Sequence, residues 1–145
     1  ACETGLIDLN SISDEYIGLP SGFLFAGSPS VVSSLWTVND LSTSFLMIKF
    51  YENLFDENQQ FSVPVALKTA QNWLQNLTVR EAEENLESQA FQQALIQLQQ
   101  TLSSGDLFEL EDAIALLQTK WKAMSPDDKP FNDPFYWAAF IASGV

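Results

Sequence analysis

Histidine is absent from this 145-residue chain, and cysteine occurs once, at Cys2. Without histidine the chain cannot form a Cys–His catalytic pair by itself, and it offers few ligands for zinc. A single cysteine cannot form an internal disulfide, which favours a reducing, cytoplasmic setting. The sequence also lacks a G-x-x-x-x-G-K phosphate-binding motif and the carboxylate spacing of a calcium loop, so we expect no metal and no cofactor.

Long apolar runs and basic residues are also scarce. No stretch of about 18 apolar residues occurs, and the N-terminus lacks the basic and apolar regions of a signal peptide, so we expect no membrane association. Nineteen acidic residues outnumber six basic ones, which gives a net charge of -13. Because this charge repels phosphate backbones, the composition argues against nucleic-acid binding and favours a basic partner or substrate segment.

Apolar residues are plentiful: they make up 46% of the chain and include four Trp and eleven Phe. That content suffices for one globular core. The chain begins at Ala1 without a start methionine, so we expect it to be the C-terminal piece of a longer protein.

The hydrophobic pattern predicts helices and strands in alternation. After a loop over 1–15, it predicts helices at about 16–26, 40–55 and 63–77, a strand at 30–36 and a last strand within 135–145. The 30–36 strand should be buried on both faces because its apolar residues are nearly continuous. This order predicts an α/β sandwich with helices on both faces of its sheet.

Residue spacing predicts the inner faces of the helices. The 40–55 helix carries apolar residues at spacings of three and four, namely Leu41, Phe45, Ile48, Tyr51 and Phe55. The 63–77 helix carries Leu67, Ala70, Trp73 or Leu74, and Leu77 on its inner face. Two further apolar stripes over 79–124, separated by Ser103 to Asp106, predict a helical hairpin that stands off the main domain as an insertion.

Cys2 is the first candidate site residue. A cysteine nucleophile needs a nearby cation, helix N-terminus or imidazole to form its thiolate, and the sequence around Cys2 supplies none. Reactive groups in α/β domains lie at the carboxyl ends of strands, and Cys2 followed by Glu3, Thr4 and Gly5 fits such a place. The alternative interpretation is a small, buried structural residue.

Asp40 is the second candidate, at the point where the 30–36 strand gives way to a helix. One interpretation is that Asp40 is the N-cap of that helix. The other is that it forms the acidic floor of a pocket for Arg or Lys, facing the same cleft as Cys2. Asp14 and Glu15 allow the same two interpretations, a helix cap or a substrate-binding acid.

Four blocks of sequence, in this order, resemble the second half of a CHAT domain, a caspase-like and separase-like peptidase module that is often fused to tetratricopeptide repeats in bacteria. They are ACETG (1–5), DEYIGLPSGFLFAGSPSVVSSLWTVND (14–40), FYENL (50–54) and PFYWAAFIASG (134–144). The resemblance implies a three-layer caspase-like sandwich whose sheet is mostly parallel. In it Cys2 ends the fourth strand, 30–36 is the fifth and 135–142 is an antiparallel sixth. Residues 1–145 would then be the C-terminal part of a CHAT peptidase domain, with 78–124 as a helical insertion.

The resemblance also implies a function, cysteine endopeptidase, with Cys2 as the nucleophile and Asp40, in LWTVND, as a substrate-pocket acid. The family's catalytic histidine belongs upstream of the cysteine, so a missing N-terminal half, with tetratricopeptide repeats, would supply it and this chain alone would be inactive. Two alternatives remain open. One is a non-catalytic scaffold for protein–protein interaction, and the other is a fragment whose open sheet edge promotes self-association.

Overall fold

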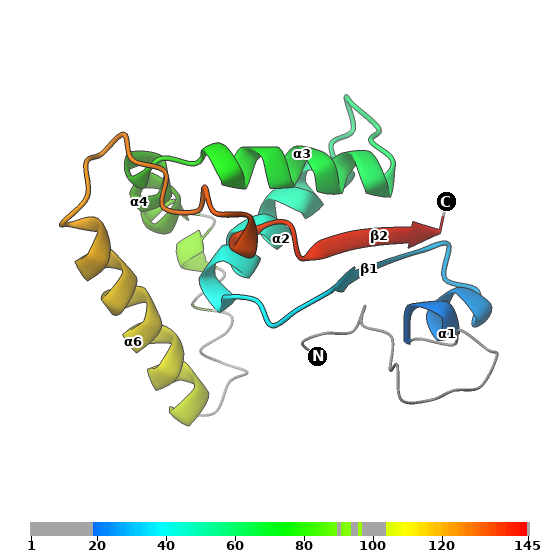
Figure 1. The fold of residues 1–145 in the computed structure, drawn as a ribbon, viewed down its shortest axis with the longest axis horizontal. Helices are drawn as coiled ribbons and strands as arrows, with labels where there is room; N and C mark the ends of the chain where they lie inside the picture. The colour runs from blue at the N-terminus through cyan, green and yellow to red at the C-terminus, as the bar shows by residue number, and fades with distance from the viewer. Residues whose placement is uncertain (1–18, 90, 94–95, 97–103, 145) are drawn as a thin grey trace. The chain divides into compact units, whose positions relative to one another are not determined.

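The computed structural model describes residues 19–89, 91–93, 96 and 104–144 (Figure 1). They fall into two compact units: unit 1 contains the described residues up to Gln75 and from Phe131 onward, and unit 2 spans Asn76–Pro130. The predicted loop over 1–15 lies outside the described residues. Within them, no helix combines the length and apolar character that crossing a bilayer requires.

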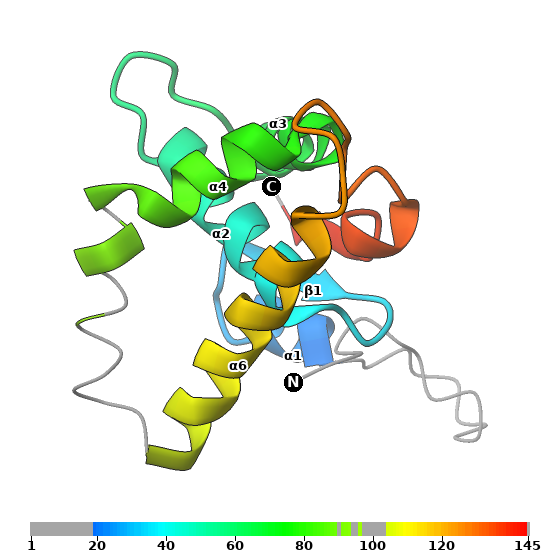
Figure 2. The same ribbon diagram turned by 90° about the vertical axis from the view of Figure 1, so that its left-hand side faces the viewer.

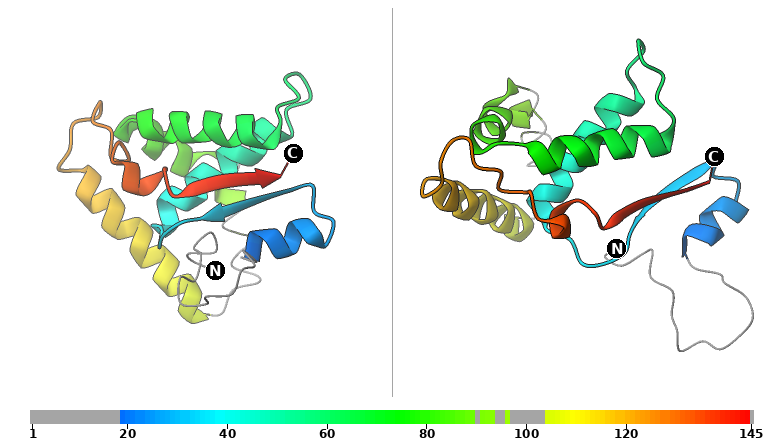
Figure 3. Two further views of the ribbon diagram at one scale, coloured as in Figure 1. Left: turned by 45° about the vertical axis from the view of Figure 1, so that its right-hand side comes forward. Right: turned by 45° about the horizontal axis from the view of Figure 1, so that its top comes forward.

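The sheet of unit 1 has two strands among the described residues, β1 (Ser30–Ser34) and β2 (Phe140–Gly144). They pair antiparallel, with Ser30 opposite Gly144 and Ser34 opposite Phe140, and they run side by side in both views of Figure 3. The two predicted strands are confirmed with shorter bounds, and the combination of helices with this sheet agrees with an α/β class.

Two features of the sheet differ from the sequence prediction. Residues Ser30 to Val32 of β1 are only half-buried, whereas Ser33 and Ser34 are buried. The last strand begins at Phe140 rather than at 135, since Pro134–Tyr136 form a 3-10 helix, η1. Asp133 caps this turn by accepting a hydrogen bond from the Phe135 N–H, and proline suits a helix start because its φ is already helical.

Helix α1 (Leu19–Phe25) lies against β1 and buries none of its residues. Pro20 lies in its first turn, as predicted. The helix ends in a Schellman motif: Ser28 N–H donates to the Phe23 carbonyl and Gly27 N–H to that of Leu24, with Gly27 at a φ of 99°.

Helix α2 (Asp40–Leu54) confirms the predicted 40–55 helix, but its N-cap is Asn39 and not Asp40. The Asn39 side chain accepts a hydrogen bond from the Ser42 N–H at 3.1 Å, which leaves Asp40 as the first helical residue. The predicted apolar stripe is buried only in its first half. The buried apolar residues are Leu41, Phe45, Leu46 and Phe50, whereas Ile48, Tyr51 and Phe55 are exposed.

Helix α3 (Val63–Asn76) buries Leu67, Ala70 and Leu74, which confirms its predicted inner face. Ring contacts of Phe45 with Trp73 and with Phe131 connect α2, α3 and the C-terminal segment. Gln71, buried in α3, donates from Nε2 to the carbonyl oxygens of Trp137 at 3.0 Å and Phe140 at 2.9 Å. This one amide therefore holds the segment that leads into β2.

Unit 2 contains α4 (Val79–Glu87) and α6 (Ser104–Trp121), which Figure 2 shows in green and in yellow to orange. The predicted first helix of the hairpin is interrupted: Ser88 is extended, and its Oγ accepts a hydrogen bond from the Phe91 N–H. The predicted turn over Ser103 to Asp106 is also wrong in part, because α6 already begins at Ser104. The first predicted stripe consists of Leu86, Phe91, Leu95, Leu98 and Leu102, and the last three of these lie outside the described residues.

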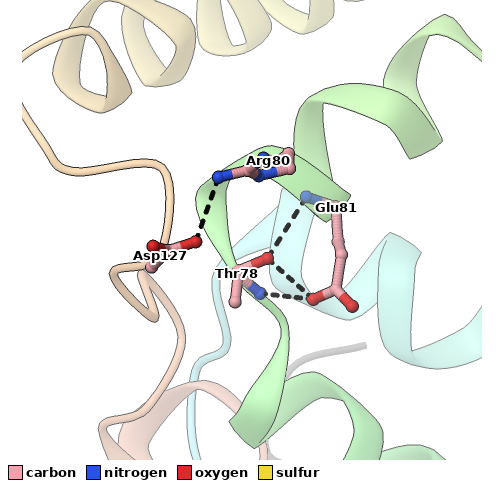
Figure 4. Close-up of polar contacts among 4 residues, drawn as sticks. All are labelled: Thr78, Arg80, Glu81 and Asp127. Atoms are coloured by element: carbon pink, nitrogen blue, oxygen red, sulfur yellow. Dashed lines mark hydrogen bonds and ion pairs between the residues drawn. The ribbon is translucent and has the colours of Figure 1, made fainter.

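The two ends of unit 2 are bonded to each other (Figure 4). Val79 N–H donates to the Asp128 carbonyl at 2.9 Å, Arg80 N–H donates to the Pro126 carbonyl at 3.1 Å, and the Arg80 guanidinium pairs with Asp127 at 3.1 Å. Thr78 and Glu81 form a capping box at the start of α4. The chain thus enters and leaves unit 2 at neighbouring points.

Replacement of Gln71 by leucine should lower the free energy of unfolding by about 2–4 kcal/mol, because a buried and a partly buried carbonyl oxygen lose their donor while the side-chain volume is nearly kept. Urea unfolding measures the change. Gln118→Leu is the matched control, since Gln118 is exposed on α6, and it should change stability by less than about 0.5 kcal/mol. Equal losses in the two variants would contradict the role assigned to Gln71.

Replacement of Glu81 by glutamine should make stability less sensitive to acid. Hydrogen bonds from the Thr78 backbone N–H and hydroxyl lower the pKa of the Glu81 carboxyl. The ionised group therefore stabilises the fold above its unfolded pKa, and this contribution is lost as the pH falls through the lower, folded pKa. Melting temperatures between about pH 5 and pH 3 should decline less steeply in Glu81→Gln than in the parent protein. Glu83→Gln, on an exposed position of the same helix, should follow the parent curve.

Candidate functional site

Hydrogen bonds from Leu35, Trp36 and Ser42 fix the junction between β1 and α2. Leu35 N–H donates to the Ala139 carbonyl at 2.9 Å, and Trp36 Nε1–H donates to the Phe135 carbonyl at 3.2 Å. At the start of α2, Ser42 donates from its backbone N–H to the Asn39 side chain and from its hydroxyl to the Asn39 carbonyl. These bonds place the first turn of α2 at the carboxyl end of β1.

Asp40 occupies that first turn and is exposed. Its backbone carbonyl accepts a hydrogen bond from the Ser44 hydroxyl at 2.8 Å, and within the described residues its carboxylate has no hydrogen-bond or ion-pair partner. The positive end of the α2 dipole favours a negative charge here. Because Asn39 already caps the helix, the Asp40 carboxylate is available to pair with a cation, and a strand's carboxyl end is where α/β proteins bind ligands.

The remaining predicted site residues, Cys2, Asp14 and Glu15, lie outside the described residues. Asp40 is therefore the predicted site residue whose surroundings the structure describes. Within the described part of the chain, no group of three or more His, Cys, Asp or Glu side chains could hold a metal ion.

Sequence reasoning missed a groove between β1 and α2. It has a volume of about 420 Å³ and is lined by Ser30, Val32, Ser33, Ser34, Thr43, Met47, Phe50, Tyr51, Leu54, Val63 and Phe140. The sequence indicates this groove only weakly. Strand β1 contains three serines among its five residues, and α2 has more apolar residues than one helix face can bury. Only the packing decides which of those apolar residues meet the core and which line the groove.

Comparison with known proteins identifies the family. The CHAT domain model matches residues 1–145, the whole chain, and the protein therefore belongs to the CHAT domain family. No curated protein and no solved structure matches the chain.

Proposed function

We propose that this chain is the nucleophile-bearing part of a cysteine endopeptidase of the CHAT, caspase-like type. CHAT membership along residues 1–145 carries the proposal, since that family includes caspase-like peptidases, and the exposed Asp40 carboxylate at the carboxyl end of β1 supports it. The fold would be a caspase-like three-layer sandwich of which β1 and β2 are the last two strands. Residues 78–124 would form a helical insertion in it.

Cys2 is the proposed nucleophile. Its thiolate attacks the carbonyl carbon of the scissile peptide bond, forming a C–S bond, and backbone N–H groups, including that of Cys2, stabilise the oxyanion. The C–N bond then breaks, the leaving amine takes a proton from an imidazolium, and a thioester remains. Water hydrolyses the thioester and restores the thiol.

The imidazole must come from a partner, because the chain contains no histidine. The proposed partner is the N-terminal half of the domain, joined to tetratricopeptide repeats. A reducing cytoplasm suits this chemistry because it keeps the Cys2 thiol available. Without its partner, the chain would be inactive.

Asp40 is the proposed substrate-binding acid, with Asp14 and Glu15 as further candidates. A carboxylate that is exposed and has no partner among the described residues can accept a bidentate pair of hydrogen bonds from an arginine side chain, or an ion pair from lysine. The proposed substrate is a polypeptide with Arg or Lys before the scissile bond.

A non-catalytic CHAT scaffold is the second candidate function. Exposed aromatic side chains favour it: Phe25 is 96% exposed, and the exposed rings of Tyr51 and Phe55 stack at 6.0 Å on α2. Exposed aromatic side chains are typical of protein-binding surfaces. Reaction of Cys2 with iodoacetamide distinguishes the two candidates, because an activated thiolate reacts faster than an ordinary thiol and a scaffold has no need of one.

Replacement of Cys2 by alanine in the complete protein should reduce kcat/KM for polypeptide cleavage by at least about 10³-fold, because no thioester can form. Cleavage is followed on gels, with circular dichroism to show that the variant is folded. Retained cleavage, or a complete protein without histidine upstream of Cys2, would refute the proposed mechanism.

Replacement of Asp40 by asparagine should reduce kcat/KM for substrates with Arg or Lys before the scissile bond by about 10–100-fold, mainly through KM, because a charge-assisted pair is lost. Substrates with an apolar residue there should be cleaved at the parent rate. The control is Glu57→Gln, which removes another exposed carboxylate of unit 1. A loss that is the same for basic and apolar substrates would assign Asp40 no role in specificity.

A further inference from the structure

Two aromatic side chains lie beside the junction that carries Asp40. Trp36 is half-buried in the segment between β1 and α2, and Phe135 is 49% exposed in η1. The Trp36 Nε1–H donates to the Phe135 carbonyl at 3.2 Å, and the preceding Leu35 N–H donates to the Ala139 carbonyl at 2.9 Å. The η1 segment therefore lies alongside the stretch of chain that leads from β1 to Asp40.

The Phe135 ring is supported from the core although it is exposed. It makes a T-shaped contact with Tyr136 at a centroid distance of 5.5 Å, and Tyr136 makes another with Phe131 at 5.4 Å. Phe131 is 1% exposed and contacts the buried Phe45 of α2. A ring with this support loses little conformational freedom when a ligand covers it, which is a property of the aromatic residues that contribute most to binding surfaces.

The Trp36 ring offers apolar surface and no free hydrogen-bond donor. Its indole N–H, the one polar group of the side chain, already donates to the Phe135 carbonyl. Each ring also has an exposed carboxylate nearby in the chain: Asp40 follows Trp36 by four residues, and Asp133 accepts a hydrogen bond from the Phe135 N–H at 2.8 Å. An acidic ligand group is repelled here, whereas an apolar group gains by covering the rings.

The expected occupant follows from the continuity of these rings with the proposed substrate site. A polypeptide whose Arg or Lys pairs with Asp40 continues on both sides of that residue, and an extended chain advances about 3.3 Å per residue. Side chains within a few residues of the Arg or Lys therefore come within reach of Trp36 and Phe135. An uncharged, apolar side chain of the same substrate fits this surface.

We infer that Trp36 and Phe135 form an apolar subsite beside Asp40, which binds an apolar side chain of the substrate polypeptide a few residues from its Arg or Lys. The inference rests on the proposed function for the identity of the ligand. It adds a second determinant of specificity, so that a basic residue with an apolar neighbour binds more tightly than a basic residue alone.

The test measures peptide binding to the complete protein with Cys2 replaced by alanine, so that no readout depends on cleavage. Each peptide has one arginine in a background of glycine and serine, and leucine is placed in turn at each nearby position on either side. At one or two positions leucine should lower the dissociation constant about 5–10-fold, measured by isothermal titration calorimetry, because apolar area is buried. Phe135→Ala should reduce this gain to less than about twofold.

Two further variants separate the subsite from a purely structural role of Phe135. Phe135→Leu keeps an apolar side chain and should retain most of the gain from leucine. Phe55→Ala is the matched control, because Phe55 is a more exposed aromatic residue, at the opposite end of α2 from Asp40, and it should leave the gain unchanged. A ratio of dissociation constants does not depend on how much of a variant is folded, so a loss of stability in Phe135→Ala would not imitate the expected result.

Equal affinity for all the peptides would overturn the inference, as would a gain from leucine that Phe135→Ala leaves intact. Absence of binding by every peptide would overturn it as well. Failure of the proposed function has a different signature: the protein with Cys2 intact would cleave no polypeptide, although the peptides bind with the same preference for leucine.

Discussion

The position of β2 depends on the side-chain amide of Gln71. From the middle of α3 this group donates to two carbonyl oxygens that are 66 and 69 residues further along the chain, those of Trp137 and Phe140. The chain passes through all of unit 2 between these points, and closing so long a loop has an entropic cost that local interactions do not offset. The buried amide, together with the contact of Phe131 with Phe45, fixes where the chain returns. The pairing of β2 with β1, and the Leu35 and Trp36 bonds that hold the start of α2, follow from it.

The chain can leave unit 2 close to where it entered, because the two ends of unit 2 are bonded to each other. The backbone bonds from Val79 and Arg80 to residues 126–128 close the unit on itself, and Lys129 Nζ donates to the Asn76 side chain at 2.9 Å. An insertion whose ends are adjacent can vary in length without changing the distance that the host chain must span. This geometry explains how the helical segment of unit 2 can lie between α3 and β2 in the sequence of the chain.

Two observations support the candidate site: the chain belongs to the CHAT domain family, and the Asp40 carboxylate is exposed at the start of α2. Asn39 caps the start of α2, so the Asp40 carboxylate is not used as the helix cap. Because the chain contains no histidine, the proposed catalysis needs an imidazole from a second polypeptide segment.

The sequence by itself determined the family, the existence of β1, α2, α3 and β2, and the inner face of α3, because these depend on local periodicity, on turn residues and on motif order. Proline and glycine positions also follow from local backbone requirements. Pro20 and Pro64 lie in the first turns of α1 and α3. Gly144, at a φ of 104°, has no room for a Cβ beside the Pro29 carbonyl. Tertiary structure decided which apolar residues of α2 are buried, since the spacing of Ile48, Tyr51 and Phe55 is as regular as that of the core residues. It also decided that Asn39 rather than Asp40 caps α2, and that the hydroxyl oxygens of Ser33 and Thr43 are buried beside a groove. These outcomes depend on which helix and strand surfaces pack together. Contacts between residues far apart in the chain produce no periodic pattern of apolar residues, so sequence analysis could not predict them.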